Sequence, residues 1–213
     1  HPERPFYQTN AARIGTEYSG AKLNGTISES GNPKNPRIFS GYSGTNKSEL
    51  SYSEAARWLL HVNNFDDGSG KPKGKDLPSP GAGWLAKLGV IYAVGDTLFE
   101  TLLLNLILLR PDSWGLWESE KPAWELTQPR IAERCEIAIP DNLSELYTLQ
   151  SRRIILKRNG DKVIGYTLLG GDFFDQIDAF NEPMTVWKKA EDKGAKAIVR
   201  YCPARHDVSK QVW

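Results

Sequence analysis

A hairpin signal in the C-terminal half of the chain most narrows the folds that it can adopt. The segments RRIILK (152–157) and KVIGYTLL (162–169) have the composition of β-strands, and RNGD lies between them. Asn159-Gly160 suits a type I′ turn, in which both central residues need positive φ, so two antiparallel strands are predicted here. Because helical patterns occur elsewhere in the chain, the sequence predicts an α+β fold of mixed helices and antiparallel hairpins.

The first helical pattern begins at a capping box. Ser51 and Glu54 have the S-x-x-E spacing in which each side chain bonds the backbone N–H of the other residue. An apolar face follows as far as about Asn63. It consists of Ala55, Trp58, Leu59, Leu60 and Val62.

A second apolar block follows residue 87. LGVIYAV (88–94) predicts a buried strand. Thr97 and Glu100 form another capping box, and the helix that they start is expected to run to about Leu109. Its apolar residues cover nearly the whole circumference, which predicts a core helix packed on several sides.

The two ends of the chain are less regular. Residues 1–50 are rich in Gly, Ser, Asn and Pro with little periodicity, so a long loop is expected around GYSGTNKSEL (41–50). AKAIVRY (195–201) predicts a further strand. With 213 residues, 39% of them hydrophobic, the chain can bury a sizeable core, and we expect residues 1–213 to form a single α+β region.

Charge and cysteine content exclude some classes of protein. The net charge is +1, but residues 151–213 carry twelve Lys and Arg against eight Asp and Glu, which either hints at an anionic partner or reflects scattered surface lysines. Cys135 and Cys202 are too few for a disulfide framework or a zinc site and are expected to be inert thiols. The longest apolar run, residues 98–109, is too short to span a bilayer, so a soluble intracellular protein without a membrane partner is expected.

The sequence contains few groups of residues that could form a catalytic site. The histidines are His1, His61 and His206, of which His61 suits a structural role and His206-Asp207 is a weak acid–base candidate. GSGKPKGK (68–75) lacks the spacing of a phosphate-binding Walker A loop. The sequence therefore predicts a protein that is not an enzyme and has no metal or cofactor.

The segment between the two helical blocks, residues 65–84, is suited to binding. Gly68, Ser69 and Gly70 offer backbone N–H groups with little bulk, so this loop can approach the minor groove of a duplex. Lys71 and Lys73 beside it can neutralise phosphates. A solvated surface loop is the alternative interpretation.

The order of several segments resembles a known family. HPERPFYQT (1–9), EAARWLLHVNNFDD (54–67), SPGAGWLAKLG (79–89) and GDTLFETLLLNLILL (95–109) look like the CasA family, the large subunit of the type I-E CRISPR surveillance complex Cascade. LYTLQSRRI (146–154), NEPMTVWK (181–188) and HDVSKQVW (206–213) continue the resemblance over essentially the whole chain. It implies part of the large N-terminal domain of a CasA-like subunit, with the preceding segment and the C-terminal helical bundle absent.

The resemblance also implies a function in the cytoplasm of a prokaryote. CasA-like subunits help to read the protospacer-adjacent motif (PAM) on foreign duplex DNA, contact the guide RNA (crRNA), join the other Cascade subunits and support recruitment of a helicase-nuclease. In this ribonucleoprotein, protein reads the motif and base pairing reads the target, as in RNA-guided antiviral defence generally. The family's glycine loop corresponds to Gly68, Ser69 and Gly70, with Lys71 and Lys73 beside it.

Two further parts of the family's interface fall on this sequence. The loop that approaches the 5′ handle of the crRNA corresponds to Phe39, Ser40, Gly41, Tyr42, Ser43, Gly44 and Lys47. A lysine that contributes to motif reading has two candidates here, Lys157 and Lys162.

Two other functions remain open at this point. Trp114, Trp117 and Trp124 would suit a carbohydrate- or protein-binding module, although tryptophans in such a segment more often fix a loop to the core. An enzyme that uses His206 and Asp207 is the third hypothesis.

Overall fold

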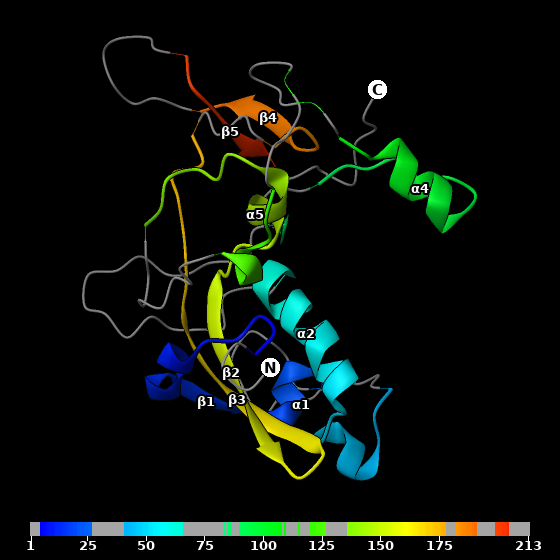
Figure 1. The fold of residues 1–213 in the computed structure, drawn as a ribbon, viewed down its shortest axis with the longest axis vertical. Coiled ribbons are helices and arrows are strands. Elements are labelled where there is room, and N and C mark those ends of the chain that lie inside the picture. The colour runs from blue at the N-terminus through cyan, green and yellow to red at the C-terminus, as the bar shows by residue number, and fades with distance from the viewer. Residues whose placement is uncertain are drawn as a thin grey trace.

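A three-stranded antiparallel sheet packed against one long helix forms the centre of the molecule (Figure 1). The computed structural model describes residues 5–26, 41–65, 83, 85–86, 90–107, 109, 115, 120–126, 136–177, 182–190 and 199–204. Helices and antiparallel sheets are both present, so the expected α+β class is confirmed. None of the helices in these ranges is long and apolar enough to cross a membrane.

The sheet has the order β1-β3-β2, with β1 at Thr16–Ser19, β2 at Arg152–Asn159 and β3 at Lys162–Gly170. The predicted hairpin is confirmed, since Asn159 pairs with Lys162. Its turn is one residue further on than expected, because the central pair is Gly160-Asp161. Of these two central residues, only Gly160 has a positive φ, of 56°, which is the pattern of a type II′ turn.

The principal core lies between one face of this sheet and α2, Tyr52–Phe65. The predicted capping box is present: the Glu54 N–H donates to Ser51 Oγ at 3.3 Å, and the Ser51 N–H donates to the Glu54 carboxylate at 2.9 Å. Leu60 is 38% exposed, so the true inward face is narrower than the predicted one. The core comprises Tyr7, Leu23, Leu50, Ala55, Leu59, Val62, Ile154, Val163, Tyr166 and Leu168.

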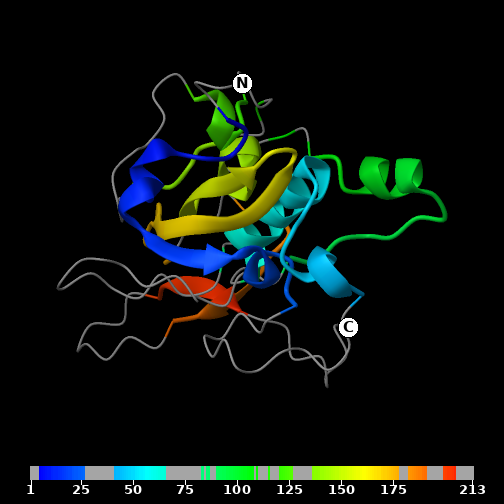
Figure 2. The same ribbon diagram turned by 90° about the horizontal axis from the view of Figure 1, so that it is seen from below.

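The N-terminal segment contributes more to the fold than its composition indicates. It contains the 3-10 helix η1 (Asn10–Ile14), strand β1 and the short helix α1 (Gly20–Leu23). β1 pairs with β3, and its first residue, Thr16, lies opposite Leu168. Figure 2 shows this segment along one side of the sheet, so residues expected to be irregular form one of its edges.

A second, smaller core surrounds α5, Leu143–Tyr147. It joins Leu143, Leu146, Leu149 and Phe174 and receives partly buried side chains, including Trp187 of β4. β4 (Val186–Lys189) pairs with β5 (Tyr201–Ala204) in a separate two-stranded sheet. Of the strand predicted over 195–201, the described part is confirmed only at Tyr201: Val199 and Arg200 precede β5, which begins at Tyr201 and continues beyond the predicted end to Ala204.

Near α5, the 3-10 helix η3 (Ala123–Glu125) carries one of the predicted tryptophans. The Trp124 ring packs against Phe6 at 5.0 Å and Tyr7 at 5.3 Å between centroids. It fixes its segment to the core residue Tyr7, whereas Trp114 and Trp117 lie outside the described residues.

Helix α4, Leu98–Leu104, differs from its prediction in length and in burial. The Thr97–Glu100 capping box is confirmed, but the helix ends before Asn105 and not near Leu109. None of its seven residues is buried; Leu98 is 75% and Phe99 70% exposed. Figures 1 and 2 both show α4 set apart from the central sheet, so the prediction of a core helix is wrong for this structure.

The strand predicted over 88–94 is also wrong in its described part, since residues 90–94 form no strand. The backbone of Ala93 is bonded by a side chain and not by a neighbouring strand. Its N–H donates to Asn105 Oδ1 at 2.8 Å, and its carbonyl accepts from Asn105 Nδ2 at 2.6 Å. Ile91, Tyr92 and Val94 are 41%, 59% and 74% exposed, which excludes the expected buried strand.

Candidate nucleic-acid interface

The loop from Gly41 to Glu49 is the described part of the segment expected to contact RNA. It contains the 3-10 helix η2, Gly44–Lys47, in which no residue is buried. Gly44 has a φ of 57°, a conformation that favours glycine, and an added Cβ there or at Gly41 would contact nothing within 4 Å in the described structure. The loop therefore presents an open backbone and the exposed cation Lys47.

The side chains of Asn24 and Trp58 form hydrogen bonds with this open loop. The Asn24 side chain, 3% exposed, donates to the carbonyl of Lys47 at 3.1 Å and to that of Asn46 at 3.5 Å. Tyr42 is fixed from the side, because the Trp58 indole N–H donates to its hydroxyl at 3.3 Å. Buried polar groups need such partners, so these bonds determine the path of the loop.

The loop ends on the hairpin. Leu50 and Val163 exchange two backbone hydrogen bonds of 2.9 and 2.8 Å. Leu50 thus pairs with β3 on the same side as β1, just past the point where β1 ends. Two residues later, the Tyr52 hydroxyl donates to the Gly160 carbonyl at 2.8 Å. The first turn of α2 and the hairpin turn thus support each other beside the loop.

One of the two candidate lysines is the chain neighbour of this contact. Lys162 precedes Val163, and its positive charge reaches the first turn of α2, where it lowers the pKa of Glu54. The larger causes of that lowered pKa are the hydrogen bonds from the Ser51 side chain and backbone, and Arg57 also contributes. Lys162 therefore lies near the first turn of α2, next to the bridge at which the loop ends.

Lys157, the other candidate, has a different environment. Its ammonium lies 2.6 Å from the Glu17 carboxylate of β1, and the two side chains are 41% and 68% exposed. An ion-paired lysine is less available to an incoming phosphate than an unpaired one. The two candidate lysines therefore have different environments: Lys157 is paired with a carboxylate, whereas Lys162 lies near the first turn of α2.

The remaining candidates lie outside the described residues. These are the glycine-loop residues Gly68, Ser69, Gly70, Lys71 and Lys73, the residues Phe39 and Ser40 that begin the RNA-contacting segment, and His206, Asp207 and Cys135. Cys202 is described and is a free thiol. The His61 ring lies edge-to-face with Trp58 at 5.2 Å and stacks on Phe65 at 5.8 Å between centroids, in keeping with a structural role.

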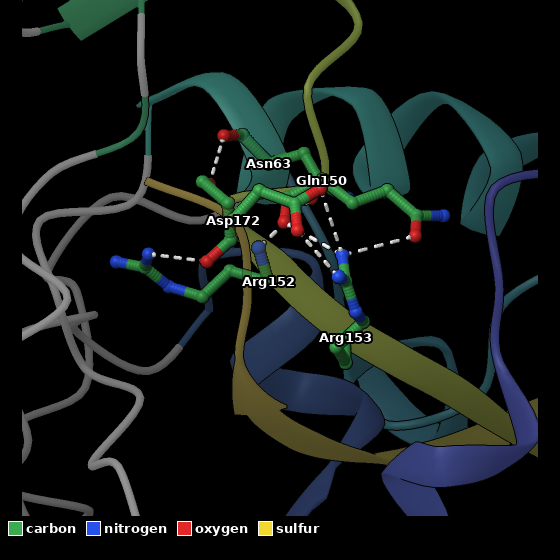
Figure 3. Close-up of polar contacts among 6 residues, drawn as sticks. Asn63, Gln150, Arg152, Arg153 and Asp172 are labelled. Atoms are coloured by element: carbon green, nitrogen blue, oxygen red, sulfur yellow. Dashed lines mark hydrogen bonds and ion pairs between the residues drawn. The ribbon is translucent and has the colours of Figure 1, made fainter. Parts of the chain in front are cut away.

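A buried ion pair supports the base of the hairpin, and sequence reasoning missed it (Figure 3). The Arg153 guanidinium contacts the Asp172 carboxylate at 2.6 and 3.2 Å and also donates to the Gln150 carbonyl at 3.1 Å. The two charged side chains are 0% and 3% exposed. This pair closes the open end of the β2–β3 hairpin.

Asn63 joins the same region to α2. Its side-chain oxygen accepts from the Arg152 N–H at 3.1 Å, and its carbonyl accepts from the Ser151 hydroxyl. Figure 3 shows the side chains of Arg152 and Arg153 pointing to different sides of the strand. Neighbouring arginines at the end of a predicted strand were the only signal, and exposed charge is the usual interpretation of such a pair.

Within the described ranges, no three His, Cys, Asp or Glu side chains gather in a group that could hold a metal ion. Tyr7 and Tyr147 have raised pKa values, chiefly because burial disfavours the phenolate. Tyr7 donates to the carbonyls of Thr148 and Leu149 at 2.8 and 3.2 Å, so its hydroxyl serves the fold.

Comparisons with known proteins find one family. The model of the family described as CRISPR-associated protein Cse1 matches residues 1–213. The crystal structure of Thermobifida fusca Cse1 superposes with a TM-score of 0.74 and 30% identity, over 100% of this chain and 41% of that chain. Cse1 from Acidimicrobium ferrooxidans is also 30% identical, with a TM-score of 0.64 over 94% of this chain and 38% of that chain.

A curated relative, the CRISPR-associated protein CasA/Cse1 of Thermus thermophilus, is 27% identical over 96% of this chain and 39% of its own length. These similarities define a class of CRISPR-associated α+β proteins. The chain belongs to the Cse1 family, also called CasA. It spans about two fifths of the length of the relatives that it matches.

Proposed function

We propose that this chain is part of a non-catalytic, nucleic-acid-binding subunit of a type I-E CRISPR surveillance complex. The family match over residues 1–213 is the observation that carries the proposal. A structure described as a CRISPR RNA-guided surveillance complex has the same fold, with a TM-score of 0.65 at 18% identity. In this proposal the chain acts in the prokaryotic cytoplasm with crRNA and other Cascade subunits, and residues 1–213 form one α+β region of a longer protein.

Within that complex, the loop at 39–47 contacts the 5′ handle of the crRNA. The open backbone at Gly41 and Gly44, the exposed Lys47 and the nearby Lys162 support this assignment. Backbone N–H groups and lysines are typical contacts to phosphate oxygens. The firm attachment through Asn24 and Leu50 presents them on a fixed support.

Gly68, Ser69 and Gly70 are proposed to meet the PAM of double-stranded target DNA, with Lys71 and Lys73 on its phosphates. The complex then recruits the helicase-nuclease. A glycine backbone suits the minor groove, where the donor and acceptor pattern is coarse and side chains have little room.

Binding measurements with the assembled complex test the DNA contact. Replacing Gly68, Ser69 and Gly70 by leucine is expected to leave assembly with crRNA intact and to abolish binding of PAM-bearing duplex. Replacing Lys71 and Lys73 by alanine is expected to reduce the salt slope of log K by about 1.8, at about 0.9 per phosphate. Unchanged affinity of the leucine variant would contradict the assignment of the loop.

A separate experiment tests the RNA contact. Lys47→Glu is expected to weaken binding of crRNA by the assembled subunits, because it places a carboxylate beside the RNA phosphates. Lys189→Glu makes the same charge change on an exposed residue of β4 and is the matched control. Equal effects of the two substitutions would show that only net charge matters.

A further inference from the structure

A hollow of about 780 Å³ lies along the outer edge of β2. Its walls come from residues 5–8, η1, β2 and the first half of α2, with Glu17 of β1 and Thr167 of β3. β2 is the edge strand opposite β1, whereas Leu50 and the loop before it attach along the β1 side of β3. Residues 41–47 are not among the residues that line the hollow.

The charges around the hollow are mainly positive. Arg13 of η1 and Arg158 of β2 are both exposed, and neither is paired with a carboxylate in the described part of the chain. Lys157 also lines the hollow but is neutralised by Glu17 at 2.6 Å. The guanidinium groups of Arg13 and Arg158 therefore remain unpaired among the described residues, and guanidinium groups form bidentate hydrogen bonds with phosphate.

A buried hydroxyl in the wall also lacks a partner. Thr167, in the central strand β3, is 3% exposed, and its Oγ1 has no hydrogen-bond partner among the described residues. A buried hydroxyl left unbonded costs free energy, so such groups are rare in folded proteins. Because Oγ1 itself has almost no accessible surface, a polar ligand in the hollow would supply the missing partner by displacing the side chains that cover it.

Apolar surface completes the site. Ala56, Leu59 and Leu156 line the hollow on the α2 side, and Phe6 at its rim is 41% exposed. Its volume lies within the range of about 300–1,000 Å³ typical of ligand sites. A ligand with flat rings and phosphates matches this combination better than an acidic peptide, because aromatic side chains stack on bases.

We propose that this hollow binds a segment of single-stranded nucleic acid. Arg13 and Arg158 contact its phosphates, a base packs on Phe6, and the Thr167 hydroxyl bonds a polar group of the strand. The site is additional to the loop at 39–47 and rests on the proposed nucleic-acid role for its class of ligand.

Fluorescence anisotropy with the full chain and labelled oligonucleotides of about 12 nucleotides tests the proposal, using RNA and DNA in parallel. The double variant Arg13→Glu, Arg158→Glu is expected to bind less tightly. Its salt slope is expected to fall by about 1.4, at about 0.7 per phosphate of a single strand. The control variant Lys188→Glu, Lys189→Glu changes net charge equally on the separate β4–β5 sheet. Equal losses in the two variants would overturn the proposal.

The near-isosteric change Thr167→Val tests the hydroxyl. Affinity for the oligonucleotide is expected to fall while the unfolding midpoint is maintained, because the hydroxyl has no partner to lose within the described protein. Unchanged affinity would overturn the Thr167 contact. Displacement of the oligonucleotide by polyglutamate at equal charge concentration would overturn the choice of ligand.

The two proposals fail in different ways. If Lys47→Glu weakens crRNA binding but the hollow variants bind oligonucleotides normally, this inference is wrong and the proposed function stands. If neither set of variants affects nucleic-acid binding, both the RNA contact of the loop at 39–47 and this inference are wrong.

Discussion

Two ion pairs in this protein have the same separation but different surroundings. Arg153–Asp172 and Lys157–Glu17 each show 2.6 Å between nitrogen and oxygen. The first pair is almost completely buried, whereas the second is 41% and 68% exposed. Water screens the exposed pair, so distance alone says little about what either pair contributes to stability.

Removing one charge from each pair tests this difference. Asp172→Asn leaves the Arg153 guanidinium buried without a counter-charge and is expected to cost about 3–5 kcal/mol of unfolding free energy. Glu17→Gln is expected to cost less than about 1 kcal/mol. Urea denaturation followed by circular dichroism measures both values. Similar losses in the two variants would mean that burial does not govern the Arg153 pair.

Glu54 gives the chain a residue-level dependence on pH. Its pKa is lowered chiefly by hydrogen bonds from Ser51, so folding favours its ionised form. The resulting stabilisation is present above the pKa of the unfolded carboxyl and is lost as pH falls through the lowered folded value. Glu54→Gln is therefore expected to destabilise the chain at pH 7 and to approach the parent's stability at about pH 3. Denaturation midpoints at both pH values check this, and a constant difference would contradict it.

At the scale of elements, α1 and the loop above it form a tightly fitted unit. A Cβ on Gly20 would lie 2.1 Å from the Ser48 carbonyl oxygen, which is backbone and cannot rotate away. The absence of a side chain at Gly20 therefore permits α1 to lie directly beneath the loop that carries Lys47.

Gly20→Ala is consequently expected to destabilise the chain by about 1–3 kcal/mol, although alanine is normally the better helix former. Gly41→Ala is the matched control, because its Cβ would meet nothing within 4 Å in the described structure. Thermal unfolding measures stability, and limited proteolysis within 41–49 reports whether the loop has moved. Equal behaviour of the two variants would show that the close approach at Gly20 is not maintained.

The elements that the sequence predicts correctly have local signals. The capping boxes at Ser51 and Thr97 and the turn near Gly160 each depend on residues three or fewer apart. The apolar run at 88–94 has no such signal, and a distant residue, Asn105, occupies its backbone at Ala93. Apolar composition predicts that a segment can be buried, but a packing partner decides whether it is.

The candidate site was also predictable only in part: its residue types were visible in the sequence, whereas their positions were not. The loop and the lysines were predictable as chemistry, since open glycines and cations are visible in the sequence. Their positions were not, because Lys162 lies next to the bridge between Leu50 and Val163, two residues that are more than a hundred positions apart along the chain. Arg153 and Asp172 meet because Asp172 follows the end of β3, which lies beside the start of β2, and no local pattern predicts that pairing.

For the whole molecule, the main irregularity is the apolar surface around α4. Leu98, Phe99, Leu102, Leu103 and Leu104 are each more than half exposed. Exposed apolar patches of this kind promote association of a protein in solution. We therefore expect the 213-residue chain to bind hydrophobic dyes and to self-associate as its concentration rises.

Leu102→Glu is expected to reduce dye fluorescence and light scattering without lowering the unfolding midpoint, because Leu102 is 62% exposed. Leu59→Glu, at a residue only 1% exposed, is expected to unfold the central core. Anilinonaphthalene sulfonate fluorescence and static light scattering measure the first effect. No change in either for Leu102→Glu would show that α4 is covered in solution.

The β2–β3 hairpin is fastened at both ends, by the Tyr52–Gly160 bond at its turn and by the Arg153–Asp172 pair at its base. A ladder closed at both ends has no free end from which to fray. Its amide protons should then exchange with deuterated water only when the central core opens as a whole. Asp172→Asn should convert this slow, collective exchange into stepwise exchange that begins near Arg152 and proceeds towards the turn.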